Sequence, residues 1–329
     1  MRPGALDLVK FLRLVEWLIQ DRPGLVQTWM YHADVIGGLA ARLVRRAKIV
    51  WGIHNSTLDP ERTRRTTRWT VALSARLSYS VPDCIVSVSR ASRDLHVDAG
   101  YDASKFVIIP NGFDLSEFRP DATRRGDVRA ELGIREDAFV VGLVARVDPQ
   151  KDHLNFVRAA ALLAPRRPDA RFLLCGQGTD QGGPLARVIA ERGLLDRFVL
   201  LGRRDDVPRI MNAIDVVSLS SAYGEAFPLV IGEAMSCGVP CVVTDVGDSA
   251  YLVGDTGRVV APRDAEALAS AWEGLAAAGA EGRRTLGSAA RVRIERNFAL
   301  SRIAARYAEV YRALVSDGAA GGAAESLVP

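Results

Sequence analysis

Two glutamates eight residues apart, Glu225 and Glu233, are the side chains of this sequence with the clearest chemical use. An apolar strand over Val216–Ser220 is predicted to lead into a small-residue loop that carries Glu225. Pro228 favours the first turn of a following helix, where its missing N–H has no partner to lose, and Glu233 falls inside that helix. The free amides of the helix start favour an anion between the two carboxylates. This layout suits a ligand with hydroxyls at both ends and phosphate between them, as in a nucleotide-sugar.

Two cations, Arg146 and Lys151, belong to a second motif further upstream. The apolar run Phe139–Val147 is typical of a buried strand in a parallel sheet, and a helical stretch follows from Asp152. At the carboxyl end of such a strand, an arginine that binds oxygens bidentately and a lysine that acts as a point charge can clamp a diphosphate. Each motif alone is also compatible with solvated surface residues, since 43 of the 329 residues are Lys or Arg.

Strands and helical stretches alternate along most of the chain. The first helical pattern covers Asp7–Gln20, where apolar residues recur at helical spacing. A run of strand–helix units predicts an α/β protein with doubly wound parallel sheets and helices on both faces. The expected strands are Leu25–Trp29, Lys48–Ile53, Cys84–Val88 and Phe106–Ile109 in a first series, and Phe139–Val144, Arg171–Cys175, Phe198–Leu201, Asp215–Leu219, Pro240–Thr244 and Arg258–Val260 in a second.

The length of 329 residues is sufficient for two domains. The polar stretch Leu115–Asp137 is interpreted as the connection between them, and a helical series is expected from Asp264 to Gly282. The predicted division is residues 1–120 for a first domain, 121–298 for a second, 299–315 for a helix that crosses back to the first, and 316–329 for a disordered tail rich in Gly and Ala.

Several further segments carry a family resemblance together with the two motifs. They are Ile109-Pro-Asn-Gly-Phe-Asp114, Gly142-Leu-Val-Ala-Arg146 with Lys151, Leu174-Cys-Gly-Gln-Gly178, Val199-Leu-Leu-Gly202, Glu225-Ala-Phe-Pro-Leu with Glu233-Ala-Met-Ser-Cys-Gly-Val-Pro240, and Val243-Thr-Asp-Val-Gly247. In this order the sequence resembles the retaining glycosyltransferases of family 4 over residues 25–315. The resemblance implies the GT-B fold, which has two Rossmann-like doubly wound domains with a cleft between them.

The resemblance also implies roles for individual residues. Arg146 and Lys151 would hold the donor diphosphate and stabilise its charge as it leaves, Glu225 would meet the hydroxyls of the transferred sugar, and Glu233 those of the ribose. His54 would orient the sugar or act on the developing positive charge, although a structural hydrogen bond is the alternative role for a histidine at a strand end. The implied catalytic residues are His54, Glu225, Arg146 and Lys151, and the implied donor-binding residues are Arg146, Lys151, Gly202, Arg203, Glu225, Phe227, Leu229, Glu233 and Asn111.

The expected activity is that of a retaining glycosyltransferase. It would move a sugar from a nucleotide-sugar donor to a glycan or lipid-linked acceptor, in the biosynthesis of cell-surface polysaccharide or glycolipid. No metal is expected, because Arg146 and Lys151 supply the cations. No cofactor is expected either, because the nucleotide-sugar is the donor substrate.

Two alternatives remain. Family members begin with a strand and a glycine-rich loop that this sequence lacks, so either Met1 is a misplaced start or the chain is a fragment that binds nucleotide-sugars without transferring them. A dinucleotide oxidoreductase is suggested by Gly176, Gly178 and Gly182, but the third glycine comes one residue late and no acidic residue ends the next strand.

Basic residues are concentrated in the first part of the chain. Residues 1–120 contain 17 Lys and Arg against 12 Asp and Glu, whereas the remaining residues contain 26 and 27. The basic residues are concentrated in the segments Arg42–Lys48 and Arg62–Trp69. This pattern suits an anionic membrane surface or an acidic lipid-linked acceptor as well as a solvated helix face. Nucleic acid is not expected as a partner, because no recognised module accompanies the charge.

A cytoplasmic protein, peripheral at the inner face of the cell membrane, fits the rest of the composition. No apolar run approaches the roughly 20 residues that span a bilayer. The first helix does not resemble a signal peptide, because Lys10, Arg13 and Glu16 interrupt its apolar positions. The four cysteines are interpreted as small buried hydrophobic residues in a reducing compartment; they are Cys84, Cys175, Cys237 and Cys241.

Overall fold

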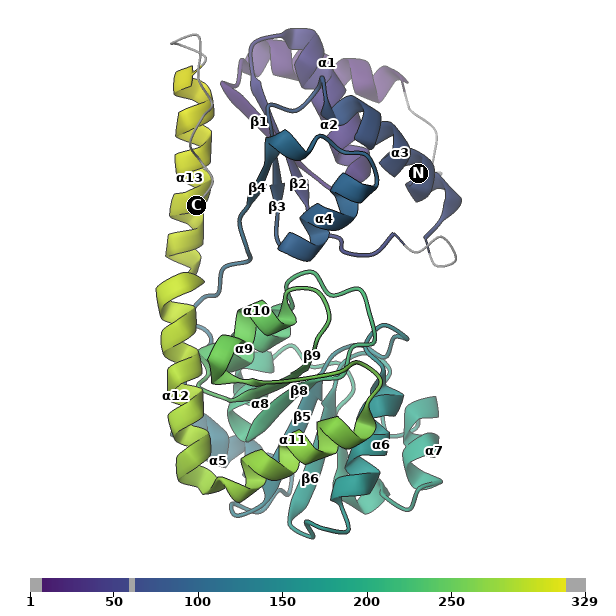
Figure 1. The fold of residues 1–329 in the computed structure, drawn as a ribbon, viewed down its shortest axis with the longest axis vertical. Coiled ribbons are helices and arrows are strands. Elements are labelled where there is room, and N and C mark those ends of the chain that lie inside the picture. The colour runs from purple at the N-terminus through teal and green to yellow at the C-terminus, as the bar shows by residue number, and fades with distance from the viewer. Residues whose placement is uncertain (1–7, 59–62, 318–329) are drawn as a thin grey trace. The chain divides into compact units, whose positions relative to one another are not determined.

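The computed structural model describes residues 8–58 and 63–317, and the chain divides into two compact units. The first unit combines residues 1–110 with residues 303–329, and the second comprises residues 111–302. Each unit contains one parallel β-sheet with helices packed around it (Figure 1). The expected α/β class with two Rossmann-like units is therefore confirmed.

The sheet of the first unit has the strand order β1-β2-β3-β4, and each neighbouring pair is parallel. Its strands are β1 (Leu25–Trp29), β2 (Lys48–Ile53), β3 (Cys84–Ser87) and β4 (Phe106–Ile108), in agreement with the predicted strands to within one residue. Its helices are α1 (Leu8–Asp21), α2 (Tyr31–Val44), α3 (Arg65–Ser78), α4 (Arg90–Asp98), the 3-10 turn η1 (Ala103–Lys105) and most of α13 (Leu300–Asp317).

Two apolar clusters cover the two faces of this sheet. Alternate residues of β2 divide between them, with Trp51 in the cluster beneath α1, α2 and α3 and Val50 in the cluster beneath α13. Trp51 has no exposed surface. The alternation of side chains along a strand explains how one short strand supplies both faces.

The second sheet has the order β10-β9-β8-β5-β6-β7, again wholly parallel. Its strands are β5 (Phe139–Val144), β6 (Ala170–Cys175), β7 (Phe198–Leu200), β8 (Val216–Leu219), β9 (Cys241–Thr244) and β10 (Arg258–Val260). The helices of this unit are α5 (Ala122–Glu131), α6 (His153–Leu163), α7 (Pro184–Ala190), α8 (Val207–Ala213), α9 (Leu229–Ser236), α10 (Ser249–Val253), α11 (Ala265–Ala277) and α12 (Gly279–Asn297), with 3-10 turns η2 (Leu195–Arg197) and η3 (Gly254–Thr256).

Aromatic residues fill the core between this sheet and helices α6 and α11. Phe156 on α6 lies 4.9 Å from Trp272 on α11 between ring centroids, and Phe172 on β6 lies 6.1 Å from the same indole. The buried indole N–H is satisfied, because Trp272 Nε1 donates to Ser218 Oγ at 3.1 Å. This packing fixes α6 and β8, which flank the loops described below.

Residues 115–137 do not form an interdomain connection, so that prediction is wrong. They contain α5, which belongs to the second unit and begins where the Asp121 carboxylate caps the Arg124 amide at 3.0 Å. The stretch is polar because the buried guanidinium of Arg129 is part of the packing. It donates to Asp215 Oδ2 at 2.8 Å and to four backbone carbonyls.

The first unit ends at residue 110 rather than 120, and the return to it begins at residue 303 rather than 299. The helical series expected from Asp264 to Gly282 is two helices, α11 and the longer α12. The final helix runs to Asp317, two residues beyond its predicted end, and the rest of the predicted disordered tail lies outside the described residues.

Candidate active site

The loops that carry the two motifs leave the second sheet at the same edge. Strands β5 and β8 are adjacent and parallel, with Val141 opposite Val216. Because parallel strands end on the same side, the loop after Val144 and the loop after Leu219 emerge next to each other at their carboxyl ends. That edge is where open α/β sheets bind ligands.

Three hydrogen bonds join these loops. The Ala222 amide donates to Gln150 O at 2.8 Å, Gln150 Nε2 donates to Gly224 O at 2.8 Å, and Ser220 Oγ donates to Lys151 O at 2.7 Å. Gln150 was not among the predicted site residues, although it stands next to Lys151 in the sequence. The loops are thereby held as one structure, which fixes the position of Lys151 relative to Glu225.

Lys151 and Glu225 form an ion pair in the centre of the joined loops. Lys151 Nζ lies 2.5 Å from Glu225 Oε1, and the same oxygen accepts a 2.6 Å hydrogen bond from Ser221 Oγ. The two charged side chains are largely buried, with exposed fractions of 16% and 6%. The sequence assigned the cation to phosphate and the carboxylate to sugar hydroxyls, and the structure places them in contact. Ser221 was not among the predicted site residues either.

Arg146 is the exposed member of the cation pair. Its side chain is 60% exposed, and Nη2 lies 3.3 Å from Asp148 Oδ2. An exposed ion pair of this kind contributes about 0 to 1 kcal/mol, so little holds the guanidinium in place. Arg146 is therefore available to turn toward an anion at the loop edge.

Glu233 lies in the second turn of α9, as the spacing predicted. Pro228 is the residue that precedes the helix rather than its first residue, and it provides no side-chain cap. The Glu233 carboxylate is half-buried and forms no hydrogen bond with any described residue. Burial, with a smaller effect of the Glu117 charge, raises the pKa of Glu233 to about 7. A half-buried carboxylate without a donor is a ready acceptor for ligand hydroxyls.

The loop before α9 is held by an amide and two rings. Asn111 Nδ2 donates to Phe227 O at 3.2 Å, so the Asn111 side chain anchors this loop. Phe227 is 4% exposed and stacks 6.3 Å from Phe113. Leu229, the first residue of α9, is 51% exposed. The buried Phe227 can therefore meet a ligand mainly through its backbone, whereas Leu229 also offers an exposed side chain.

Gly202 and Arg203 follow β7 at the same edge of the sheet. Gly202 has a φ of 62°, a backbone conformation that residues with a side chain rarely adopt, and it packs against the Asp180 carboxylate. Its carbonyl accepts from the Gly176 amide at 2.7 Å. Arg203 is 79% exposed and lies 3.3 Å from Asp205. The glycine is required by the backbone conformation, and the arginine is an exposed surface cation.

His54 belongs to the first unit, where it follows β2. It is solvent-exposed, yet the surrounding protein lowers its pKa by desolvation. The imidazole is therefore mainly neutral near pH 7. A neutral ring can accept a hydrogen bond at one nitrogen and donate one at the other.

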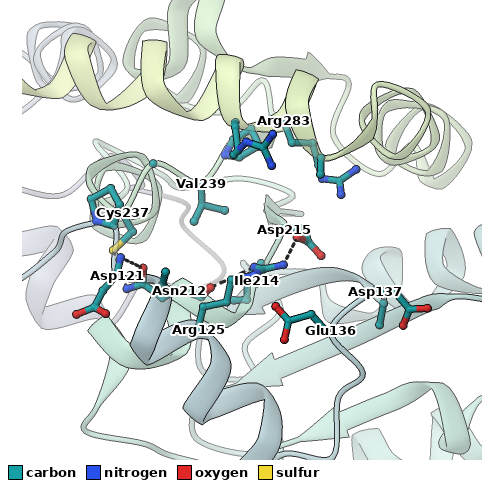
Figure 2. A pocket seen from close by; sticks show the side chains of 17 residues that line it. Asp121, Arg125, Glu136, Asp137, Asn212, Ile214, Asp215, Cys237, Val239 and Arg283 are labelled. Atoms are coloured by element: carbon teal, nitrogen blue, oxygen red, sulfur yellow. Dashed lines mark hydrogen bonds and ion pairs between the residues drawn. The ribbon is translucent and has the colours of Figure 1, made fainter.

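A cavity of about 470 Å³ in the second unit (Figure 2) is lined by none of these residues. Ala138, Asp215 and Pro240, which line it, each immediately precede a strand, so it opens at the amino ends of the strands. Arg125, which lines the cavity, forms an ion pair with Asp215, with 2.7 Å between Nη2 and Oδ1. The cavity is therefore separate from the motif loops.

Metal-binding clusters are not found among the described residues, where no three His, Cys, Asp or Glu side chains could share an ion. The four cysteines are free and buried, as predicted. In the described part of the chain, no helix combines the length and the apolar character that crossing a membrane requires.

Comparison with protein families matches both parts of the chain. Residues 138–277 match the family described as "Glycosyl transferases group 1", and residues 2–117 match "Glycosyltransferase Family 4".

Three curated relatives illustrate the similarity. A UDP-Gal:alpha-D-GlcNAc-diphosphoundecaprenol alpha-1,3-galactosyltransferase of Escherichia coli is 29% identical, covering 75% of this chain and 64% of the relative. A D-inositol 3-phosphate glycosyltransferase of Mycobacterium marinum is 31% identical, covering 85% and 58%. The lipopolysaccharide core biosynthesis mannosyltransferase LpsB of Rhizobium meliloti is 30% identical, covering 95% and 87%. The chain thus spans less than two thirds of the length of the first two.

Solved structures resemble the fold closely. Anabaena Alr3699/HepE in complex with UDP has a TM-score of 0.82 at 25% identity, covering 92% of this chain and 82% of that chain. The same protein in complex with UDP-glucose has a TM-score of 0.80 at 26% identity, with the same coverage.

Proposed function

Because this chain belongs to the family 4 glycosyltransferases, we propose that it transfers a sugar from a nucleotide-sugar donor to a glycan or lipid-linked acceptor, in the biosynthesis of cell-surface polysaccharide or glycolipid. The observation that carries the proposal is the buried contact of Lys151 with Glu225 at 2.5 Å, at the carboxyl ends of β5 and β8. The contact brings a cation and a hydrogen-bonded carboxylate to the edge where open α/β sheets bind ligands, which supports this edge as the donor site.

A UDP-sugar is the first donor to test. The E. coli relative is named for UDP-Gal, and the Anabaena protein was solved with UDP and with UDP-glucose. Glu233 is the residue that we propose for the nucleotide. Its carboxylate has no hydrogen-bond donor in the described structure and lies one helical turn beyond the start of α9. The ribose hydroxyls would supply the missing donors.

Arg146 and Lys151 would neutralise the diphosphate as the bond to the sugar breaks. A positioned cation that meets charge developing in the transition state lowers the barrier to its formation. We expect the leaving phosphate to take the acceptor proton on the same face of the sugar, which gives retention of configuration. Lys151 then touches both the leaving group and Glu225, which would orient the sugar hydroxyls.

The test is a transfer assay with UDP-glucose or UDP-galactose and a polyprenyl-diphosphate-linked GlcNAc acceptor, with the product anomer read by NMR. We expect an α-linked product from the wild type and a loss of transfer of roughly 100-fold or more in the variant Lys151→Ala, on the scale of losing one transition-state donor. A β-linked product would contradict retention. Equal transfer by the variant would contradict the role of Lys151.

Metal independence is tested in the same assay. We expect undiminished transfer in EDTA, because Arg146 and Lys151 supply the positive charge at the diphosphate. A loss that is restored by magnesium would overturn this part of the proposal.

The first unit carries a surface that suits an acceptor held at the inner face of an anionic membrane. Arg42, Arg45 and Arg46 form no ion pair with any described residue, and they line a cavity of about 880 Å³ together with apolar residues that include Phe11 and Leu39. Trp69 on α3 is 78% exposed. Cations beside exposed apolar groups attract anionic lipid by about 1 kcal/mol each near the surface.

Vesicle co-sedimentation tests this contact. We expect the wild type to bind vesicles with phosphatidylglycerol and not vesicles of phosphatidylcholine, and Arg42→Ala/Arg46→Ala to bind the anionic vesicles at least fivefold more weakly. The matched control is Arg158→Ala/Arg296→Ala, which removes two exposed charges from helices of the second unit. Equal weakening in both pairs would show that net charge, and not this surface, attracts the membrane.

A further inference from the structure

A buried polar network lies next to the loop that begins at His54. Tyr31 OH and His96 Nε2 are 2.8 Å apart, and His96 Nδ1 lies 2.6 Å from Ser92 O. A carbonyl can only accept, so His96 Nδ1 carries the proton, Nε2 has a free lone pair, and Tyr31 donates to it. The exposed fractions of Tyr31 and His96 are 4% and 0%. This arrangement requires a neutral imidazole.

The network reaches the loop through Asn55, the residue after His54. Asn55 Nδ2 donates to Tyr31 OH at 3.4 Å, and Ser92 Oγ donates to Asn55 O at 2.6 Å. The Asn55 amide also closes a local turn, donating to Thr57 O at 2.8 Å and accepting from the Thr57 amide at 3.3 Å. Helix α2 therefore holds the side chain of Asn55, and helix α4 holds its carbonyl.

Such a network is poorly explained by stability alone. Burying a tyrosine hydroxyl and an imidazole has a desolvation penalty, and their hydrogen bonds do no more than compensate for it. An apolar pair of similar volume would avoid the penalty altogether. What the polar groups add is a defined geometry, because hydrogen bonds are directional. These bonds fix the position of Asn55, and with it that of the neighbouring residue His54.

We propose that Tyr31 and His96 are positioning residues for His54. Tyr31 holds the side chain of Asn55, and His96 bonds both Tyr31 and the carbonyl of Ser92, whose hydroxyl holds the Asn55 carbonyl. Together they fix the direction in which the His54 ring leaves strand β2, without touching a substrate themselves. The inference rests on the proposed function, in which His54 orients the sugar or acts on its developing charge. It adds to that function two residues from helices α2 and α4.

The first test compares Tyr31→Phe with Tyr101→Phe. Tyr101 is an apt control, because it is 2% exposed, its ring lies 5.2 Å from the same His96 ring, and its hydroxyl has no hydrogen-bond partner in the described structure. We expect Tyr31→Phe to lower kcat roughly 10- to 100-fold, the scale of a small misplacement of a reacting group, with the donor KM within twofold. We expect Tyr101→Phe to change neither. Equal loss in both variants, or a loss confined to KM, would overturn the proposal.

A double-mutant cycle separates positioning from general damage. If Tyr31 acts through His54, Tyr31→Phe causes no further loss of kcat in the His54→Ala background. Losses that multiply would mean that Tyr31 acts independently of His54. Should Tyr31→Phe fold poorly, His96→Leu gives the same comparison, since it removes the acceptor of the Tyr31 hydroxyl at a similar side-chain volume.

Amide hydrogen exchange tests the inference without relying on transfer. We expect exchange at the Thr57 amide to be at least tenfold faster in Tyr31→Phe than in the wild type, and unchanged in Tyr101→Phe. Unchanged exchange in both variants would overturn the positioning role even if transfer is impaired. Absence of transfer by the wild type, or full transfer by His54→Ala, would instead refute the proposed function of His54 and leave the exchange result to decide whether Tyr31 orders the loop.

Discussion

Replacing Glu233 by glutamine should stabilise the ligand-free protein while weakening its hold on the donor. The pKa of Glu233 is raised from its ordinary 4.5 to about 7, chiefly by burial. The native state therefore binds this proton more tightly than the unfolded chain does. Stability from this group is fully present below pH 4.5 and is lost as the pH rises through 7. Glutamine is neutral at every pH and avoids that loss.

The magnitude follows from the two pKa values. The gap between 4.5 and about 7 corresponds to at most roughly 3 kcal/mol above pH 7, because each tenfold change in proton affinity is about 1.4 kcal/mol. At roughly 2 to 4 °C per kcal/mol for a unit of this size, Glu233→Gln should melt up to roughly 10 °C above the wild type at pH 8.5. At pH 4.5 the two proteins should melt within about 1 °C of each other.

Donor affinity should move in the opposite direction. A hydrogen bond to a charged group contributes about 1.5 to 3 kcal/mol, so losing the carboxylate should raise the Kd for a UDP-sugar by roughly 10- to 100-fold at pH 8.5. Thermal melts and titration calorimetry at pH 4.5, 7 and 8.5 check both effects. Glu191→Gln, which changes an exposed glutamate of the same unit, is the control. A melting temperature of Glu233→Gln that is no higher at pH 8.5 would refute the burial argument, and an unchanged Kd would refute the contact with the ribose.

Two further predictions concern the packing that holds the site. Asp215→Ala should lower the free energy of unfolding by about 3 to 5 kcal/mol, because it leaves the buried Arg129 guanidinium without its counter-charge; urea unfolding measures this, and a loss below 1 kcal/mol would contradict it. Gly232→Ala should strongly destabilise the second unit, since the added methyl would collide with the Phe113 ring. Gly274→Ala is the matched control, because nothing lies within 4 Å of its added methyl, and a helical alanine there should raise the melting temperature slightly. Similar melting temperatures for the two alanine variants would show that Phe113 yields easily.

Apolar periodicity predicted the strands well because each is short, apolar and bounded by turn residues. Strands β5 and β8 were located from such patterns, and the helix that carries Glu233 from Pro228. Helix α5 was missed because its buried face includes Arg129, whose guanidinium is satisfied by carbonyls brought together only by folding. Helix α12 was missed because it buries little apolar surface.

The candidate site was predictable in composition and not in its internal contacts. Spacing identified Arg146, Lys151, Glu225 and Glu233. The contact of Lys151 with Glu225 joins residues 74 positions apart, and it depends on the adjacency of β5 and β8. No local pattern contains that adjacency. For the same reason the hydrogen bond from Gln150 to Gly224 could not be inferred.

Nucleotide-sugar binding is tested most directly by thermal melts of this protein with UDP-, GDP-, ADP- and dTDP-sugars, in parallel with the double variant Arg146→Ala/Lys151→Ala. At 100 times Kd a ligand adds about 2.7 kcal/mol of apparent stability, which a melting curve resolves. We predict that UDP-sugars stabilise the wild type and leave the double variant unchanged. Equal stabilisation of both proteins, or none from any nucleotide-sugar, would contradict a donor site built on Arg146 and Lys151.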